Sequence, residues 1–254
     1  MNGSDWQYHL LQALRDGGIQ PGSTVLVHSS FKALQIPGTP DDVADVLLEA
    51  VGETGTLALP THTWATVNAK QPVFDVLLSP GCVGIIPERF RKRPGVLRSL
   101  HPTHSVAVSG QRAGELIEGH IHCSNPCDWK SPYGRLVQWD GFIVMLGVTL
   151  ACNTTYHGVE TWAGVPYGLA PGPQELWVID HQGNRLRAPS YPHLWGGEWE
   201  RRYAETAADL AQIGALTAIP WAQTQILVVQ AKPMAEYVME RLQADPGYLL
   251  TSGG

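Results

Sequence analysis

Short apolar runs alternate with amphipathic helical segments along this 254-residue chain, and this alternation constrains the fold more than any other feature. Residues 23–28, 55–60 and 142–147 have the length and apolar content of buried strands. Around them, apolar residues recur at helical spacing over 6–14 and 43–50. The pattern predicts an α/β fold, with a central sheet flanked by helices on both faces.

Residues that favour helix starts support this interpretation. Ser4 followed by Gln7 resembles a capping box at the start of the first helix. Thr39 is suited to cap the second helix, whose first turn accommodates Pro40. Ser131 precedes a proline in the same way and predicts a third helix through residue 136.

The last third of the chain adds a predicted hairpin. Segments 175–180 and 185–187 flank a Gln-Gly-Asn turn, and we expect this hairpin to make the central sheet mixed. A helix over 198–211, a strand over 225–230 and a helix over 234–242 are expected to follow. No repeat or evident linker divides the sequence, so 1–254 is predicted to be a single domain.

Charge and composition exclude several classes of protein. A formal charge of −6 argues against a nucleic-acid partner, because such binding needs basic surface. The start of the chain lacks the pattern of a signal peptide, and no apolar run reaches the roughly 20 residues of a membrane span. Four scattered cysteines favour reduced thiols. We therefore expect a cytoplasmic enzyme without a membrane partner, and a homodimer is left open.

The first loop that contains candidate functional residues follows the first predicted strand. It consists of His28, Ser29, Ser30 and Phe31. Ligands of α/β folds gather at the carboxyl ends of strands, and small hydroxyl residues leave backbone N–H groups approachable. The loop could hold a carbonyl or phosphate oxygen. The alternative is a serine-rich turn that satisfies its own backbone.

The second loop spans residues 98–105 and follows a basic stretch over 89–93. Guanidinium groups bind phosphates in bidentate fashion, so Arg98 and the basic stretch suit a phosphorylated cofactor. The further candidates in this loop are Ser99, His101, Thr103 and Ser105. The alternative for the basic stretch is the solvated face of a helix.

The third loop leads into a predicted helix that carries His157 and, one turn later, Glu160. Thr154 or Thr155 can cap this helix, and spacing by three residues places the two side chains on one face. A carboxylate there can orient an imidazole as a general base. The alternative is an ordinary surface pair.

A metal site is a rival interpretation of the histidines. His101, His104 and His157 could together ligate a metal in a metal-dependent hydrolase, although the chain has no H-E-x-x-H motif and no paired C-x-x-C motif. A serine hydrolase is disfavoured because the G-x-S-x-G motif is absent. We expect no bound metal.

Taken in order, these segments resemble the aminoglycoside 3-N-acetyltransferase family. The resemblance runs from about Val25 to about Glu160. The matching sequence segments and positions are 27–31, 51–57, 59–61, 74–75, 84–88, 90–91, 94–99, 101–102, 105, 131–132, 135–136, 146–148, 153–154, 157 and 160.

The resemblance implies an α/β enzyme that uses acetyl-CoA as cosubstrate and acetylates an amine of an aminoglycoside or related amino sugar. It maps the catalytic histidine to His157 and its accompanying glutamate to Glu160, and it places acetyl-CoA along the first two loops. Asp75, Glu160 and Trp64 are the expected substrate-binding residues, with the indole stacking on a sugar. Transfer would be direct, because an amine is itself a good nucleophile.

The sequence departs from the family pattern in three places. The stretch over 61–70 is short, Gly158 and Val159 replace the usual Leu-Ala, and His104 is additional. These departures bear on the identity of the acceptor amine more than on that of the cosubstrate. Another amine remains open as the acceptor, as does a non-catalytic relative that binds coenzyme A or a sugar.

Overall fold

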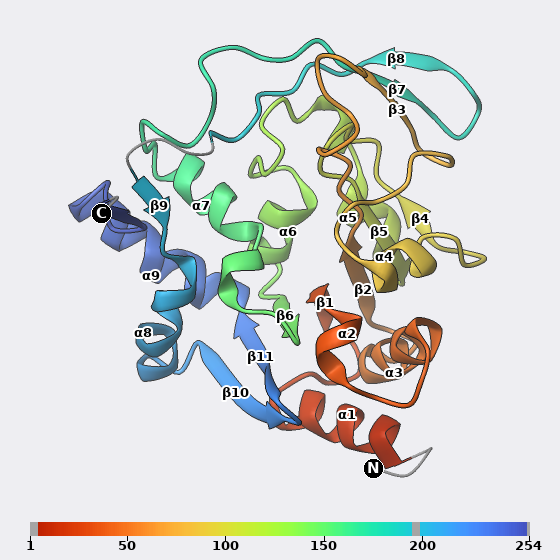
Figure 1. Cartoon of the computed structure of the whole chain (residues 1–254), viewed down its shortest axis with the longest axis vertical. Coiled ribbons are helices and arrows are strands. Elements are labelled where there is room, and N and C mark those ends of the chain that lie inside the picture. The colour runs from red at the N-terminus through yellow and green to blue at the C-terminus, as the bar shows by residue number, and fades with distance from the viewer. Residues whose placement is uncertain (1–4, 195–198, 253–254) are drawn as a thin grey trace.

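The computed structural model describes residues 5–194 and 199–252. A central sheet of seven strands has the order β10-β11-β6-β1-β2-β5-β4 (Figure 1). The strands are β1 (Thr24–Ser29), β2 (Thr56–Pro60), β4 (Leu97–Arg98), β5 (Val106–Gly110), β6 (Phe142–Leu146), β10 (Leu216–Trp221) and β11 (Thr224–Gln230). β1 pairs in parallel with β2 and β6, and the remaining pairs are antiparallel. The predicted mixed α/β sheet is confirmed.

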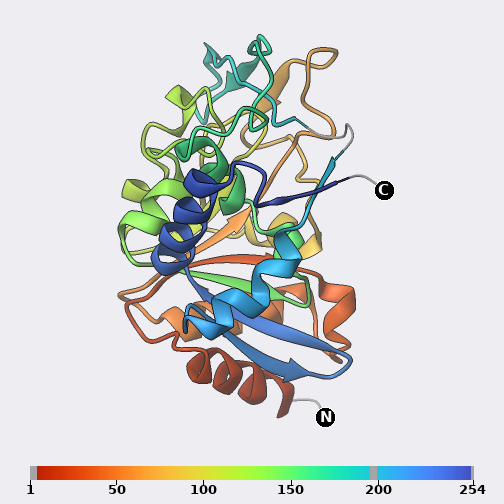
Figure 2. The same cartoon turned by 90° about the vertical axis from the view of Figure 1, so that its left-hand side faces the viewer.

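Helices cover both faces of this sheet, as Figure 2 shows. On one face lie α1 (Asp5–Asp16), α2 (Phe31–Leu34), α3 (Pro40–Val51) and α4 (Ile85–Phe90). On the other lie α5 (Ala113–Ile117), α6 (Pro132–Gln138), α7 (Thr155–Trp162) and α9 (Ala231–Ala244). Successive side chains of a strand point to opposite faces of the sheet, so each strand contributes to both cores. In β1, Val25 and Val27 pack on one face and Leu26 packs on the other. No helix in the two described ranges is long and apolar enough to cross a bilayer.

The predicted helix starts at Thr39 and Ser131 are confirmed. The Thr39 hydroxyl accepts a hydrogen bond from the Asp42 N–H at 3.2 Å, and the Asp42 carboxylate accepts from the Thr39 N–H at 2.7 Å. This reciprocal capping box fixes the start of α3. Ser131 caps α6 by accepting from the Gly134 N–H. The predicted cap at Ser4 lies outside the described residues.

The predicted hairpin forms, but it does not join the central sheet. Strands β7 (Trp177–Ile179) and β8 (Arg185–Arg187) pair with each other and with β3 (Val73–Asp75) in a separate sheet at the top of Figure 1. This small sheet has its own apolar cluster, which includes Phe74 and Val178. The mixed character of the central sheet comes from the antiparallel strands at its two ends.

The predicted helix over 198–211 is wrong in its first half. The described part of this segment begins with strand β9 (Trp199–Arg201), which pairs with β12 (Leu250–Ser252), and continues as a 3-10 turn over Tyr203–Thr206. Only α8 (Ala207–Gln212) is α-helical. A strand pairing with a segment 50 residues away overrides the local helical preference.

Candidate functional site

A cavity of about 580 Å³ opens at the carboxyl ends of the parallel strands. Its lining includes three groups of polar side chains. His28 and Ser29 come from the end of β1, and Asn153, Thr154 and His157 come from the start of α7. His62, Thr103 and His104 form a third wall. The first and third loops singled out from the sequence therefore face one space.

The start of α7 places His157 in its first turn. Thr154 occupies the cap position, but neither Thr154 nor Thr155 caps the helix through its side chain, contrary to the prediction. The side-chain oxygen of Asn153 instead accepts a hydrogen bond from the Thr155 N–H at 3.1 Å. Asparagine turns of this kind are a common way to start a helix.

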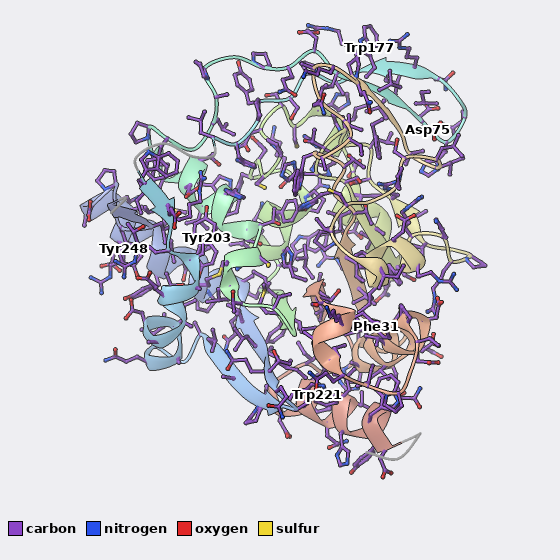
Figure 3. All side chains as sticks on the ribbon, in the orientation of Figure 1. Phe31, Asp75, Trp177, Tyr203, Trp221 and Tyr248 are labelled. Atoms are coloured by element: carbon purple, nitrogen blue, oxygen red, sulfur yellow. The ribbon has the colours of Figure 1, made fainter. Side chains whose placement is uncertain are left out.

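His157 and Glu160 contact each other as predicted. Nδ1 of His157 lies 3.3 Å from Oε2 of Glu160, and the Tyr203 hydroxyl lies 3.1 Å from the same nitrogen. Figure 3 shows Tyr203 beside α7. A carboxylate on Nδ1 favours the tautomer with the proton on that nitrogen, which leaves the lone pair on Nε2. Glu160 is fully buried and is not part of the cavity lining, which argues against the predicted contact of this residue with the substrate.

Arg201 completes this cluster from β9. Its Nε lies 3.0 Å from Oε1 and 3.3 Å from Oε2 of Glu160, and its Nη1 donates to the Leu194 carbonyl at 2.6 Å. The guanidinium side chain is 6% exposed. Arg201 and Tyr203 lie more than 40 residues from His157, inside a segment predicted as helix, so no local signal in the sequence indicated their role.

Burial and charge oppose each other in this cluster. Burial lowers the pKa of His157, and the hydrogen bond and charge of Glu160 raise it without compensating fully. The imidazole is therefore neutral near pH 7. Burial raises the pKa of Glu160, but the hydrogen bonds and charges of His157 and Arg201 outweigh it and keep that carboxyl ionised.

Further imidazoles surround the cavity. The ring of His193 stacks on His157, with centroids 4.2 Å apart and planes inclined by 18°. The rings of His62 and His104 lie 4.6 Å apart, and Nε2 of His62 lies 2.7 Å from the Tyr133 hydroxyl. Burial lowers the pKa of His62, His104 and His193 well below the usual histidine value. The cavity is therefore bordered by neutral rings.

Two polar atoms at the end of β1 are buried without a hydrogen-bond partner among the described residues. They are Nε2 of His28 and Oγ of Ser29. Burial lowers the pKa of His28 to about 3, so its ring is neutral. An unpaired buried polar atom costs about 1–3 kcal/mol, and a ligand in the cavity could supply the missing partner. These two residues fit the ligand-binding role predicted for the first loop.

The other two residues of that loop lie outside the cavity lining. Ser30 caps α2, because its hydroxyl accepts from the Ala33 N–H at 3.4 Å. The alternative of a self-satisfied serine turn therefore holds for Ser30. Phe31 begins α2 and packs against the core of that face (Figure 3). Neither contributes a side chain to the cavity, so the cofactor-binding role of these two residues stays a prediction that depends on their backbone groups.

The guanidinium of Arg98 is occupied by hydrogen bonds within the protein. Its guanidinium donates to the carbonyls of Val76, Ser79 and Thr61 at 3.1, 2.7 and 2.9 Å, and its Nε donates to two hydroxyls at 3.1 Å. Only 3% of Arg98 is exposed. Burial lowers its pKa to about 9, so it remains a cation that ties loops together.

Most polar residues of the second loop are likewise bound within the protein. Ser99 accepts from the Val106 N–H at 2.9 Å. Nδ1 of His101 accepts from the His104 N–H at 3.0 Å, so its Nε2 donates to a carbonyl at 3.1 Å. The Ser105 hydroxyl donates to the Thr61 carbonyl at 2.9 Å. Within the predicted set of this loop, Thr103 alone lines the cavity.

The basic stretch over 89–93 is paired with carboxylates. Arg91 contacts Glu88 at 2.7 Å, and Arg93 contacts both Asp41 at 3.3 Å and Asp45 at 2.7 Å. Arg89 also pairs with Asp41, at 2.8 Å. These pairs favour a structural role of the basic stretch over phosphate binding, although the side chain of Arg91 is only 4% exposed and does not form a solvated face.

The two remaining predicted substrate residues differ in position. Trp64 lines the cavity and is 53% exposed, which places its ring at the mouth. Asp75 lies on the small sheet, away from Tyr203 in Figure 3, and is not part of the lining. Its carboxylate accepts from the N–H groups of Leu77 and Leu78 at 2.9 Å. The structure therefore assigns Asp75 to a turn.

Comparison with known proteins decides the family. The sequence model described as aminoglycoside 3-N-acetyltransferase matches residues 26–243 of the chain. The protein belongs to this family. The match extends the resemblance seen over 25–160 through α9.

Relatives of this family member include aminoglycoside N(3)-acetyltransferase IV of Salmonella sp, which is 34% identical over 163 residues. That alignment covers 63% of this chain and 60% of the relative. Aminoglycoside N(3)-acetyltransferase VII of Streptomyces paromomycinus is 33% identical over 167 residues, with 59% and 58% covered. The chain thus spans about three fifths of the length of these curated relatives. The crystal structure of AAC(3)-IVa is similar with a TM-score of 0.80 at 26% identity, covering 96% of this chain and 90% of that one.

The geometry gives no support to the rival metal-dependent hydrolase. Over 5–194 and 199–252, no three His, Cys, Asp or Glu side chains are grouped to hold a metal ion. Of the three histidines that this rival needs, His101 has both ring nitrogens in hydrogen bonds. The family assignment also favours acetyl transfer over hydrolysis.

Proposed function

We propose that this protein transfers the acetyl group of acetyl-CoA directly to an amine of an aminoglycoside or related amino sugar, with His157 as general base. One observation carries the proposal: a single cavity holds His157, backed by Glu160, and the partnerless polar atoms of His28 and Ser29. Among similar structures, one is a mutant of AAC(3)-IVa in complex with apramycin and one is AAC-IIIb binary with CoASH.

The chemistry follows from the neutral imidazole. An amino-sugar amine is mostly protonated near neutral pH, and Nε2 of His157 takes the proton that blocks its lone pair. Glu160 then stabilises the imidazolium through Nδ1, at 3.3 Å. The amine attacks the thioester carbonyl, so an N–C bond forms and the C–S bond breaks. The departing thiolate receives the proton from His157, which restores the neutral ring, and the nitrogen releases its second proton to solvent as the amide forms.

The walls of the cavity suggest how the two substrates are arranged. His28 and Ser29 offer hydrogen-bonding groups at the end of β1, where they suit the amides or the carbonyl of the thioester arm. Trp64 at the mouth suits stacking on a sugar face. Neither assignment involves Arg98 or Asp75. A cytoplasmic location and a homodimeric state stay predictions from the sequence.

A thiol-release assay tests the proposal. Purified protein is mixed with acetyl-CoA and a panel of amines that includes aminoglycosides with several amino groups and sugars with a single amino group. We expect free thiol to appear with at least one acceptor and in equal amount to an acetylated amine detected by mass spectrometry. Binding of coenzyme A without thiol release for any acceptor would favour the non-catalytic relative instead.

A further inference from the structure

We infer that Arg201 is a positioning residue that keeps the catalytic imidazole neutral by competing with it for Glu160. The inference rests on the proposed function only in taking His157 as the base. Arg201 lies on β9, and the base lies on α7. The two side chains meet because both bind one buried carboxylate.

The geometry favours Arg201 in this competition. Its Nε lies 3.0 Å from Oε1 and 3.3 Å from Oε2 of Glu160, whereas Nδ1 of His157 is 3.3 Å from Oε2 alone. A hydrogen bond of 2.6 Å from Nη1 to the Leu194 carbonyl anchors the guanidinium. Because arginine stays protonated under all ordinary conditions, its charge is a fixed part of the site.

Over residues 5–194 and 199–252, the groups that the structure places against His157 from other elements are neutral or positively charged. The ring of His193 stacks on it, the Tyr203 hydroxyl contacts Nδ1, and the rings of His62 and His104 lie across the cavity. The thiol of Cys127, beside His193, has a pKa that burial raises well above its usual value. Among these described groups, Glu160 is therefore the one that is anionic near pH 7.

A lone buried carboxylate beside an imidazole would favour the charged pair. The proton would then stay on His157, and a protonated ring cannot accept a proton from the acceptor amine. Arg201 neutralises the carboxylate and repels an imidazolium, so Glu160 can hold Nδ1–H without making the ring too basic. The two neighbours shift the pKa of His157 in the directions that this inference requires. Glu160 raises this pKa, and the charge of Arg201 lowers it.

The test compares Arg201→Gln with Arg201→Lys, which keeps the charge. Arg202→Gln is the matched control, because this neighbouring side chain is 37% exposed and pairs with Glu205. The pKa of His157 is measured by NMR titration of the labelled imidazole, assigned with His157→Gln, and the acid limb of kcat/KM is measured in parallel. Neutralising a charge this close changes a pKa by roughly one to three.

We expect Arg201→Gln to raise the pKa of His157 by at least about one and to move the acid limb with it. At a pH well below both pKa values, kcat/KM should then fall about tenfold for a pKa that is higher by one, because a tenfold smaller fraction of the ring is neutral. Arg201→Lys should restore both values, and Arg202→Gln should change neither. An unchanged pKa in folded Arg201→Gln would overturn the inference.

A second pair of variants covers the case in which Arg201→Gln does not fold. Glu160→Gln and the double variant Glu160→Gln/Arg201→Gln differ only in the guanidinium, and the double variant contains no buried charge at this position. The pKa of His157 should be higher in the double variant, and equal values would overturn the inference. Because NMR needs no turnover, a wild type that acetylates nothing would refute the proposed function and leave this inference standing.

Discussion

Two buried clusters of polar side chains lie in this half of the molecule, and they are bonded in different ways. In the cluster at the end of β4, Arg98, Ser99 and His101 bind mainly backbone carbonyls and N–H groups. In the cluster of α7 and β9, His157, Glu160 and Arg201 bind one another.

This difference indicates which polar groups can take part in proton transfer. A side chain that holds several backbone groups cannot change its protonation state or move without leaving them unpaired. A cluster of titratable side chains shares its protons internally, so a proton gained by one member is compensated by another. We therefore propose that the cluster of His157, Glu160 and Arg201 serves catalysis. The cluster of Arg98, Ser99 and His101 supports the fold.

The largest expected effect is that of His157→Ala. Removing the general base should lower the rate of acetyl transfer by about 10²–10⁴-fold while the dissociation constant of coenzyme A stays nearly unchanged. Thiol release measures the first quantity and titration calorimetry the second. Wild-type turnover in this variant would show that the base lies elsewhere.

Arg98→Met tests the structural role of the cluster that contains Arg98. Three backbone carbonyls would lose their donor, and each buried carbonyl left unpaired costs about 1–3 kcal/mol. We expect the free energy of unfolding to fall by several kcal/mol, measured by urea denaturation, with no change in KM for acetyl-CoA at a temperature where the variant is folded. A large rise in KM with little loss of stability would reinstate Arg98 as a phosphate ligand.

Glu160→Gln should have an intermediate effect on catalysis. The amide can still orient the ring but cannot compensate its positive charge, so kcat should fall by roughly tenfold to a hundredfold, less than the full contribution of the base. KM should change little, because Glu160 is fully buried. A change confined to KM would mean that this carboxylate contacts the acceptor after all.

Stability should fall in acid because buried histidines must stay neutral. Burial lowers the pKa of both His28 and His120 to about 3, whereas the unfolded value is 6.5. Below pH 6.5 the unfolded chain binds protons that the folded chain does not, so each residue removes up to about 1.4 kcal/mol per pH unit between 6.5 and 3. His120→Asn should flatten this slope, measured by urea denaturation at several pH values, and replacement of the exposed His9 should not.

The smallest effect is expected on the outer surface, at Arg89. This side chain is 58% exposed and pairs with Asp41, and such pairs contribute about 0–1 kcal/mol. Arg89→Gln should change neither the free energy of unfolding by more than about 1 kcal/mol nor KM for acetyl-CoA. A rise in KM that is suppressed by salt would show that the basic stretch does meet cofactor phosphates.

Much of the fold could be predicted because its signals are local. The capping box at Thr39, the apolar run over 142–146 and the helical spacing over 6–14 depend on residues within a few positions of each other. The dyad of His157 and Glu160 was predictable for the same reason, because spacing by three places both on one helical face.

Contacts between distant segments could not be predicted in this way. The hairpin over 177–187 was recognised, but its partner β3 lies about 100 residues earlier. Arg98 has the chemistry of a phosphate ligand in the sequence, and only the carbonyls around it show a structural role.

The sequence by itself determined the family, the mixed α/β sheet and the histidine with its glutamate one turn later, because periodicity, caps and ordered motifs are properties of neighbouring residues. Tertiary structure alone decided that Arg201 and Tyr203 join that dyad and that Arg98 is buried away from the cavity. The physical reason is that burial and charge pairing depend on which segments meet in space, and these set whether a polar side chain supports the fold or moves a proton.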